Sequence, residues 1–535
     1  MTSSQPDLIE LELSDGARLQ ARCFGRFVLL RDKAESNREL TAVGRAIFEQ
    51  AFTFVDEVIA TEVEICLAVN RQFEPESLRE VEQLQLEKNA NQASNQRELR
   101  ILIDQQHGDW DAIEQHTGLS RTEYVKRLLD CRLSVAMTGF IPGFIYIKGL
   151  PDELHVPRKS NPATRTLPGT FAIGGKYAGV YSLPSAAGWN CIGRIAEQIF
   201  CKTSLPPVTI SPGDSVKLRQ IDQEEFDRLN VDSDQQQERK SASATDDSDG
   251  VLRFEHPGTL SLVQDQGRAG LAWYAIPQSG PMDSTAAELA NAILGNAKTL
   301  PVIECHFAAP RIRFLSDATI CLTGADVGWT VDGSEVKANC TVKVSAGSLL
   351  AGGGAIDRCR AYIAIHGQIE TSRTFGSAAT HVSAKFGGND GQAFVAGDQL
   401  SWQKPIKPAF PVRIKFDRTS SDSTLRLQRG PEFEFMNAAS QKAIFTDSFS
   451  VSRHSDRMGA RLDGPALSTD QKQLADSVPL LTGMVQLTPK GQLIVVLQDG
   501  QTTGGYPRVG YLDAKAVELL NQTKNGHPIN FRMAE

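Results

Sequence analysis

Several hallmarks of common protein classes are missing from this 535-residue sequence. No apolar run approaches the roughly 20 residues that a membrane-spanning helix needs, and the longest runs, such as 493–497, have the length of a strand. The 9 cysteines are scattered and form no CxxC pair, which argues against a disulfide framework and a structural zinc site. The N-terminus, MTSSQPDLIELELSDG, lacks the basic start and the apolar core of a signal peptide. These absences predict a protein of the reducing cytoplasm.

The common catalytic motifs are missing as well. The sequence contains no GxxxxGK phosphate loop, no GxSxG nucleophile elbow and no HExxH helix, and no GxGxxG follows a predicted strand. The 9 histidines have no metal-ligand spacing. We therefore predict neither a Rossmann site nor a metal site.

The composition is typical of a folded, turn-rich protein. Hydrophobic residues make up 41% of the chain, and 44 glycines and 25 prolines supply many turns. The 64 acidic residues outnumber the 56 basic ones, and the net charge of −8 argues against a broad surface for nucleic acid or anionic membrane. At about 150 residues per domain, the length predicts roughly three or four domains.

One segment without aromatic, leucine or isoleucine residues divides the chain. Residues 230–250 read NVDSDQQQERKSASATDDSDG, and such a segment buries too little apolar surface to offset the entropy of ordering it. We predict a disordered linker there, with a polar surface loop inside one domain as the alternative. A second connector, stiffened by proline, is predicted at 405–411 (PIKPAFP).

Before the linker, the pattern changes from mixed α and β to short β segments. Strands are predicted at 26–30 and 62–69, a helix at 41–54, and a partly helical connection at 74–100, with a mobile connection as its alternative. Ser120 and Glu123 form a capping box ahead of a further helix. From 141 to 218, short apolar segments broken by Gly and Pro are typical of a barrel or a sandwich.

After the linker, the sequence again predicts many short strands and few helices. Asp283 and Asp513 are each expected to cap a helix. Four segments read as strands between these helices, and they lie at 318–323, 340–344, 361–366 and 492–497.

Four clusters combine glycine with Arg, Asp, Gln and Thr. They are GFIPGFIYIKGL (139–150) with Arg158 and Arg165, GGKYAGVYSLPSAAGWNCIGR (174–194), TLSLVQDQGRAGLAWYAIPQSGPMDSTAAELAN (259–291) with Glu304, and SRHSDRMGARLDGP (452–465) with LQDGQTTGGYPRVG (497–510). Glycine allows close backbone approach to a ligand, and arginine matches carboxylate or phosphate. Turn chemistry with surface ion pairs explains any one cluster, whereas four of them in one chain favour a binding site.

These clusters resemble two known families. The last two are similar to allophanate hydrolase subunit 2, whose pattern is QDxGRxG, SGxMD, SDRMGxRLxGP and DxQTTGGYP. The first two resemble subunit 1, with GFxPGFxYxxGL and an IGR segment. Both families occur together in the carboxyltransferase domain of urea carboxylase, in the B and C subunits of 5-oxoprolinase, and in a kinase-inhibitor protein with its antagonist. The chain thus resembles a natural fusion of subunit 1 and subunit 2.

The resemblance implies a fold and a division of the chain. The fold class is mainly β with an α/β N-terminal region and a cyclophilin-like β-barrel in each half. The implied units are a small α/β subdomain (1–95) and a barrel (96–229) before the linker. After the linker come a β domain (251–410) and a second cyclophilin-like domain (411–535).

The resemblance also implies chemistry on an amide, urea or lactam carbonyl, with ATP or a partner's carboxybiotin as the activating group. Motif position suggests that Arg268, Arg457 and Arg461 supply positive charge and that Asp265 or Asp499 acts as a base or as an orienting group. The residues with an implied role in binding substrate or nucleotide are Pro142, Gly143, Phe144, Arg158, Arg165, Gln264, Asp283, Gln501, Thr502, Thr503, Gly504, Gly505 and Tyr506.

The subunit 1 half departs more from its family pattern than the subunit 2 half does. Tyr177 and Ala178 stand where Gln and Thr are usual, Ser182 and Ile145 replace prolines, and SAAGW at 185–189 replaces SPGGW. No biotin-accepting MKM tripeptide is present. The resemblance therefore implies the fused B and C component of an ATP-dependent 5-oxoprolinase that needs a separate A subunit. The alternatives are the carboxyltransferase of a biotin-dependent urea or amide carboxylase, with separate biotin carboxylase and carrier, and a regulatory kinase-inhibitor-like protein.

Overall fold

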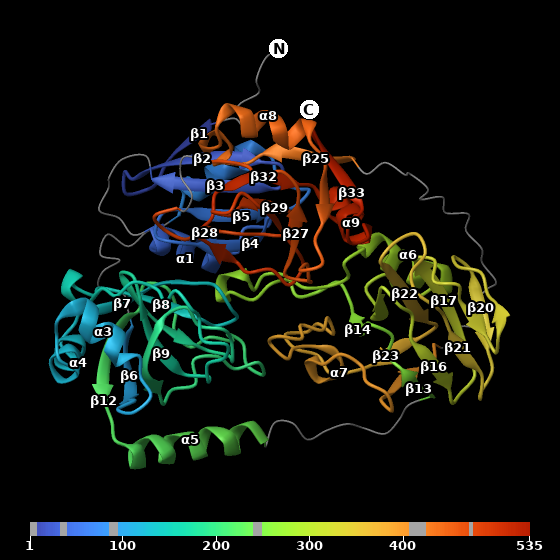
Figure 1. Cartoon of the computed structure of the whole chain (residues 1–535), viewed down its shortest axis with the longest axis horizontal. Helices are drawn as coiled ribbons and strands as arrows, with labels where there is room; N and C mark the ends of the chain where they lie inside the picture. The colour runs from blue at the N-terminus through green and yellow to red at the C-terminus, as the bar shows by residue number, and fades with distance from the viewer. Residues whose placement is uncertain are drawn as a thin grey trace.

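The described chain forms three lobes around a common centre (Figure 1). The computed structural model describes residues 8–32, 40–84, 95–238, 249–405, 424–469 and 474–534. The upper lobe in Figure 1 combines the beginning and the end of the sequence, and the two lower lobes hold the segments between them. Within these ranges, no helix is long and apolar enough to cross a membrane.

An antiparallel sheet opens the chain, with strand order β1-β2-β3-β5-β4. Its strands are β1 (Leu8–Glu12), β2 (Arg18–Phe24), β3 (Phe27–Asp32), β4 (Val55–Ala60) and β5 (Ile65–Val69). Helix α1 (Leu40–Gln50) packs its apolar side, Val43 and Ile47 included, into the core of this sheet. The two predicted strands and the predicted helix are confirmed here. The predicted connection at 74–100 begins with helical turns, η1 (Pro75–Leu78) and α2 (Arg79–Glu82), as expected. Its end was predicted wrongly, because residues 96–100 belong to strand β6 (Gln96–Ile103).

The first barrel is closed in the order β10-β8-β7-β12-β6-β11-β9. Its strands are β6 (Gln96–Ile103), β7 (Leu133–Thr138), β8 (Ile145–Lys148), β9 (Thr170–Gly174), β10 (Tyr177–Tyr181), β11 (Asn190–Ile195) and β12 (Ser215–Gln220). Helices α3 (Trp110–Thr117) and α4 (Arg121–Leu129) cover it, and Ser120 caps α4 through the Glu123 N–H at 3.3 Å, as predicted. A 3-10 turn, η2 (Asp152–Leu154), follows β8.

The predicted linker needs a correction at its start. Helix α5 (Gln223–Glu238) continues through residues 230–238, below the first barrel in Figure 1. The Asp222 carboxylate accepts the Glu225 N–H at 2.8 Å, and Phe226 packs against Ile221 and Ala196. A capped and anchored first turn lets a polar segment remain helical, because Glu, Gln and Arg cost little in a helix. Residues 239–248, and most of the predicted connector at 405–411, lie outside the described residues.

Two packed sheets form the second lower lobe. Their orders are β19-β18-β21-β16-β13-β24-β23 and β14-β15-β22-β17-β20, and their facing sides share one apolar core. The strands are β13 (Gly250–His256), β14 (Leu260–Gln264), β15 (Val302–His306), β16 (Arg311–Phe314), β17 (Ala318–Gly324), β18 (Thr330–Val331), β19 (Ser334–Glu335), β20 (Thr341–Val344), β21 (Leu349–Ala351), β22 (Arg360–Ile365), β23 (Gln368–Glu370) and β24 (Gln399–Gln403). The helical elements are η3 (Ala272–Tyr274), α6 (Ser284–Leu294) and α7 (Gly388–Gly391). We refer to this lobe as the sandwich.

A second closed barrel ends the chain, in the order β25-β32-β29-β30-β27-β26-β33. Its strands are β25 (Thr424–Arg429), β26 (Phe449–Val451), β27 (Gly459–Asp463), β29 (Met484–Leu487), β30 (Leu493–Val496), β32 (Arg508–Leu512) and β33 (Pro528–Met533). The small pair β28 (Val478–Pro479) and β31 (Thr503–Gly504) lies beside it, with η4 (Phe433–Phe435), α8 (Ala438–Thr446) and α9 (Ala514–Gln522). The mainly β class with a barrel in each half is therefore confirmed.

The N-terminal sheet packs directly on the second barrel. Phe27 on β3 meets Tyr511 on β32 edge to face, with ring centroids 4.6 Å apart. Cys66 and Ala68 on β5 share a buried cluster with Leu480, Met484 and Val496. The first and last segments of the chain therefore form one lobe, and the two halves of the sequence are interlocked.

Candidate functional site

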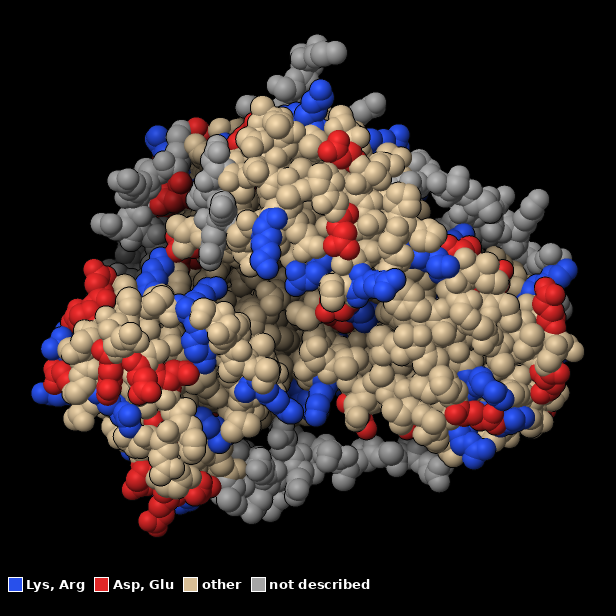
Figure 2. Space-filling view, in the orientation of Figure 1, with Lys and Arg blue, Asp and Glu red and all other residues tan. Residues whose placement is uncertain are grey.

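A cavity of about 310 Å³ lies between the sandwich and the second barrel. The sandwich contributes His306, Arg360 and Val382, and the barrel contributes Arg457 and Asp499. Figure 2 shows a hollowed centre where the three lobes meet, with Lys and Arg side chains along its upper edge. The cavity is of the size that binds small molecules.

Arg457 is the centre of the charged residues in this cavity. Its Nε donates to Asp499 Oδ2 at 2.7 Å and its Nη1 donates to Glu304 Oε1 at 2.6 Å. Its Nη2 donates to the Gly280 carbonyl at 2.7 Å. All of these charged side chains are buried, so Arg457 joins the second barrel to β15 and to the SGPMD segment of the sandwich.

The two carboxylate oxygens of Glu304 accept hydrogen bonds from four donors. Besides Arg457, Oε1 pairs with His306 Nε2 at 2.8 Å. Its Oε2 accepts the Tyr362 hydroxyl at 2.8 Å and the Met282 N–H at 2.7 Å. The Tyr362 oxygen in turn accepts the Asp283 N–H at 2.7 Å. Glu304 therefore fixes the start of helix α6 relative to the cavity.

The electrostatics follow from burial and from this pairing. Burial is the largest influence on Glu304 and opposes its ionisation, but Arg457 and His306 outweigh it and hold its pKa well below the usual range. The pKa of Asp499 is lowered as well, because Arg457 and His381 together exceed the effect of burial. Burial lowers the pKa of His306, although Glu304 partly opposes this. Two carboxylates, one guanidinium and a neutral imidazole are therefore expected at neutral pH.

Asp265 and Arg268 hold a tight turn next to this network. The Asp265 carboxylate accepts the backbone N–H groups of Ala378 at 2.7 Å and Ala379 at 3.1 Å, and also the Ser377 hydroxyl. Arg268 donates to the Thr374 and Ala379 carbonyls. Burial lowers the pKa of Arg268 to about 10, which leaves it charged at neutral pH. The Asp265 oxygens are fully used by donors, so this residue orients the turn.

Two further predicted binding residues hold backbone in place. Gln264 donates to the Thr380 carbonyl at 3.0 Å. Asp283 caps helix α6, as predicted, through the Ala286 N–H at 3.0 Å, and its other oxygen accepts Gln522 at 2.9 Å. Asp513 likewise caps α9 through the Ala516 N–H at 2.8 Å.

The GFIPGF segment of the first barrel meets the QTTGG segment of the second. The Phe140 N–H donates to Thr503 Oγ1 at 3.1 Å, and a Cβ on Gly139 would overlap with the Thr503 side chain. Gly143 has a φ of +74°, and Phe200 fills the space where a Cβ would stand. The first and fourth sequence clusters therefore touch, about 360 residues apart in sequence.

The other predicted residues of these segments have local contacts. The Pro142 carbonyl accepts the Ser182 hydroxyl, and Phe144 lies in an aromatic cluster with Tyr146, Tyr181 and Trp189. In the second barrel, the Gly505 carbonyl accepts the Leu474 N–H and the Tyr506 carbonyl accepts Gln486 Nε2. Gly504 lies on β31, with Leu480 and Gln486 where a Cβ would stand.

Gln501 and Thr502 line a smaller cavity of about 60 Å³. This second cavity lies between the N-terminal sheet, the 272–278 segment and the second barrel, and Glu57 also lines it. The Glu57 carboxylate accepts the N–H groups of Gly270 at 2.7 Å and Ala272 at 2.9 Å. Burial raises the pKa of Glu57 to about 7.

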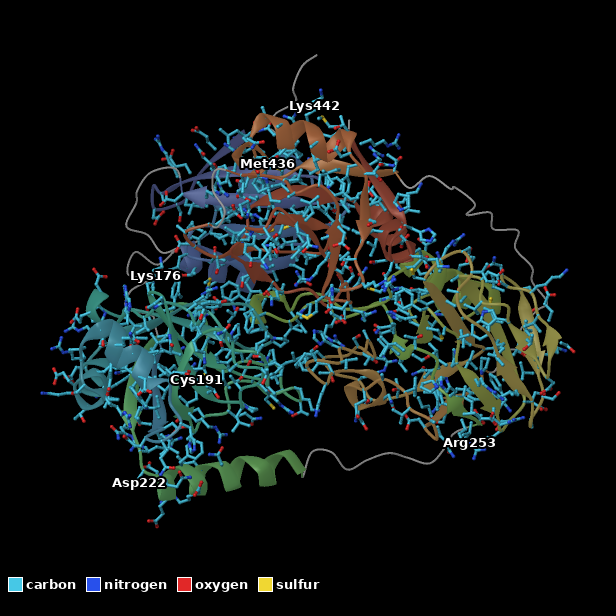
Figure 3. The ribbon with its side chains drawn as sticks, in the orientation of Figure 1. Lys176, Cys191, Asp222, Arg253, Met436 and Lys442 are labelled. Carbon is cyan, nitrogen blue, oxygen red and sulfur yellow. The ribbon has the colours of Figure 1, made fainter. Side chains whose placement is uncertain are left out.

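Three predicted arginines lie away from the large cavity. Arg461 is exposed on β27, where Ala460 and Leu462 on either side point into the barrel core. Arg158 and Arg165 are exposed on the first barrel, and the Arg158 guanidinium lies 5.8 Å from the Trp189 ring centroid. Lys176, on the edge of this barrel that faces the upper lobe in Figure 3, pairs with Asp476 at 2.6 Å.

Sequence reasoning missed four residues of the network: His306, Arg360, Tyr362 and His381. The alternation in 302–306 places Glu304 and His306 on one face of a strand. Only the pairing of β15 with β22 brings Tyr362 opposite Glu304 and Arg360 opposite His306. No group of three or more metal-binding side chains occurs in the described part of the chain.

Comparison with known families agrees with this arrangement. The model described as carboxyltransferase domain, subdomain A and B, matches residues 274–533, and the model for subdomain C and D matches residues 26–210. A solved structure of a protein named TTHA0988 covers 95% of this chain and 99% of its own, with a TM-score of 0.80 at 24% identity. That likeness concerns the fold alone.

Curated relatives match each half. The C subunit of 5-oxoprolinase from Escherichia coli K12 is 31% identical over 284 residues, which are 52% of this chain and 90% of that protein. The B subunit of 5-oxoprolinase from Escherichia coli O157:H7 is 36% identical over 110 residues, 21% of this chain and 50% of that protein. Urea amidolyase of Saccharomyces cerevisiae is 32% identical over 303 residues, 52% of this chain and 16% of that protein. This chain therefore belongs to the carboxyltransferase-domain family of urea amidolyase and of the 5-oxoprolinase B and C subunits, and it joins relatives of both subunits in one polypeptide.

Proposed function

We propose that this chain is the combined B and C component of an ATP-dependent 5-oxoprolinase-type amidohydrolase that works with a separate A-type subunit. The observation that carries the proposal is that one chain unites a relative of the B subunit with a relative of the C subunit. Their characteristic segments touch through Phe140 and Thr503. A shared site built from both halves is expected to need both subunits wherever they are separate chains.

The reaction needs activation, because the lactam of 5-oxoproline is an unstrained amide. Transfer of a phosphoryl group from ATP to the lactam oxygen releases ADP and activates the lactam carbon. One water then adds to this carbon and the C–N bond breaks, which leaves an acyl phosphate. A second water displaces phosphate and gives the open-chain carboxylate. This chemistry requires positive charge near the substrate and fixed donors around it. Arg268 supplies charge at the edge of the network, and Asp265 holds the Ala379 backbone to which Arg268 donates.

Arg457 and Asp499 act in this proposal as positioning residues. Their mutual hydrogen bonds occupy the groups that would otherwise contact a substrate directly. They hold Glu304 and the Gly280 backbone at the cavity wall. Arg461 has no part in the proposal, because its side chain is exposed on the barrel surface.

Gln501, Thr502 and the first-barrel residues keep a binding role in the proposal. Gln501 and Thr502 line the small cavity next to Glu57, where they can contact the substrate or the A-type subunit. Thr503, Gly139 and Gly143 keep the two barrels in close contact.

The experiment is an assay of 5-oxoproline-dependent ADP release by the purified chain, with and without a purified A-type subunit. Release is expected only with both proteins present. If the mixture releases no ADP beyond that of the A-type subunit alone, the proposal is wrong.

A second candidate is the carboxyltransferase of a biotin-dependent urea or amide carboxylase. It is favoured by the match of both halves to carboxyltransferase subdomains. Decarboxylation of carboxybiotin that is stimulated by urea, without 5-oxoproline-dependent ADP release, would support it. Binding to a sensor kinase with neither activity would instead support a regulatory protein.

A further inference from the structure

Arg360 is a buried cation of the large cavity without a carboxylate partner. It begins strand β22, it is 8% exposed, and it lines the cavity. None of its guanidinium nitrogens lies within ion-pair distance of a carboxylate in the described chain, and its Nε is buried without a hydrogen-bond partner. The neighbouring Cys359 thiol hydrogen-bonds with Arg360, but burial raises the thiol's pKa and keeps it neutral. A buried guanidinium without a charged partner is costly unless an anion binds to it.

The backbone around Arg360 is held in place from both sides. The Arg360 N–H donates to Gln522 Oε1 at 2.9 Å, and its carbonyl accepts Gln522 Nε2 at 3.0 Å. Gln522 also donates to Asp283, at 2.9 Å. Glu304, a buried carboxylate in the electrostatic environment of Arg360, is already occupied by Arg457, His306 and Tyr362. Arg360 is therefore fixed at the cavity wall with its charge unpaired.

His306 stands directly opposite Arg360 across the β15–β22 pair. Residues opposite each other on neighbouring antiparallel strands have Cβ atoms about 4.5–5.5 Å apart and project to the same side. Because Glu304 is ionised and accepts from His306 Nε2 at 2.8 Å, the proton of the neutral ring lies on Nε2. His306 Nδ1 then carries a lone pair, and no donor in the described residues reaches it. A donor and an acceptor thus stand side by side in the cavity.

This pair matches one chemical pattern. A guanidinium recognises a carboxylate, and a neutral imidazole nitrogen accepts an N–H. Because the two residues stand opposite each other and both line the cavity, their side chains suit a carboxylate and an amide N–H on adjacent atoms of one small ligand. Leu260, Phe307, Val451, Leu497 and Leu520 supply apolar walls for the ligand's carbon atoms.

We infer that the cavity between the sandwich and the second barrel binds a small α-amido carboxylate, with its carboxylate on Arg360 and its adjacent amide N–H on His306 Nδ1. The inference deepens the proposed function and rests on it for the choice of a cyclic amide as the ligand. It adds two residues, Arg360 and His306, as determinants of substrate specificity.

The first test uses the full chain without partner or ATP. Calorimetric binding of 5-oxoproline is compared with that of 5-oxoprolinamide, which lacks the negative charge, and of N-methyl-5-oxoproline, which lacks the N–H. Each of the two analogues is expected to bind about 10- to 100-fold more weakly than 5-oxoproline. Equal affinity for the acid and its amide, or no binding of 5-oxoproline at all, would overturn the inference.

Variants locate the binding. Arg360→Met keeps the length of the side chain without its charge and is expected to weaken 5-oxoproline binding about 10- to 100-fold. Arg311→Gln is the matched control, because Arg311 is exposed on β16 in the same lobe. Unchanged affinity in Arg360→Met, or an equal loss in Arg311→Gln, would contradict the inference. If Arg360→Met does not fold, the binding of the three ligands to the unmodified chain still tests the inference.

Binding and turnover separate this inference from the proposed function. If 5-oxoproline binds with the expected dependence on Arg360 but the complex with an A-type subunit releases no ADP, the proposed hydrolase is wrong and the binding site stands. If the complex turns over and Arg360→Met retains both the KM and the kcat, the inference is wrong and the proposed function stands.

Discussion

Arg508, near the end of the chain, donates to both carboxylate oxygens of Glu64, in the N-terminal sheet, at 2.5 and 3.1 Å, and neither side chain is exposed. Arg508 also donates to Glu432 Oε2 at 2.9 Å and Oε1 at 2.9 Å. Arg31, on β3, reaches the same two carboxylates from the surface. This network joins the two ends of the sequence inside one lobe.

The first prediction concerns the stability of that lobe. Arg508→Met leaves Glu64 and Glu432 buried with only the half-exposed Arg31 as a partner. Removal of one member of a buried ion pair costs about 3–5 kcal/mol, so we expect a loss of this size in the free energy of unfolding. Urea unfolding followed by tryptophan fluorescence measures it.

Two matched variants control this experiment. Arg31→Met removes a guanidinium whose side chain is 45% exposed and should cost less than Arg508→Met. Arg461→Met removes an exposed side chain and should change the stability by less than about 0.5 kcal/mol. A similar loss in all three variants would contradict a special role for the buried network.

The second prediction concerns the contact between the barrels. Gly139→Ala places a methyl group against the Thr503 side chain, so we expect the barrels to separate locally and the variant to lose stability by about 1–3 kcal/mol. Thr503→Ala removes the overlapping atoms and should restore part of the loss in the double variant. A thermal melt of the two single variants and the double variant tests this coupling.

Gly188→Ala is the control for Gly139→Ala. Nothing lies within 4 Å of a Cβ at Gly188, and its φ is not positive. If the stability losses of Gly139→Ala and Thr503→Ala simply add in the double variant, the effect of Gly139→Ala does not come from this contact.

The sequence predicted local features well, because their causes lie within a few residues. Ser120, Asp283 and Asp513 each cap a helix through a side chain three residues before the N–H that it accepts. Frequent Gly and Pro between short apolar segments predicted a barrel or a sandwich, and the family resemblance implied a barrel in each half, which the structure has. The prediction of a disordered linker was only partly right. Phe226 anchors the first turn of α5, and this helix continues to Glu238.

The sequence could not predict which residues, distant from one another in the chain, become partners in the site. Arg457 and Arg461 belong to one motif, yet only Arg457 turns into the cavity, since Arg461 lies on the outward face of β27. The pairing of His306 with Arg360 depends on the register of β15 and β22, which the separate strands do not specify. The contact of Arg508 with Glu64 depends on packing between the ends of the chain.

The third prediction concerns pH. The pKa of Glu57 is raised from 4.5 to about 7, chiefly by burial. Between pH 4.5 and about 7 the folded state therefore binds more protons than the unfolded state, and the stability contributed by Glu57 falls as the pH rises through this window. Glu57→Gln keeps the neutral shape and removes the titration. We expect the unmodified chain to lose stability relative to Glu57→Gln between pH 5 and pH 7, on the order of 2 kcal/mol.

The comparison between the two proteins cancels the titration of other groups. Asp499 and Glu304 have lowered pKa values, so their contributions are lost at lower pH and act in both chains alike. Urea midpoints at pH 5 and pH 7 give the difference. Parallel pH dependence in both proteins would contradict the assignment to Glu57.

The last prediction concerns Arg457. Lys at this position keeps a positive charge between Asp499 and Glu304 but loses the planar fork that also reaches the Gly280 carbonyl. We therefore expect Arg457→Lys to stay folded and to slow the turnover that releases ADP in the presence of 5-oxoproline at least about tenfold. The change in KM should be smaller, because Arg457 positions the cavity wall without touching the ligand. Arg461→Lys, in the same sequence motif but on the exposed face of β27, should retain the activity. Because the two arginines are four residues apart and differ only in where their side chains point, an equal loss in both variants would mean that the motif acts through its exposed surface, and the buried network would then lose its proposed role.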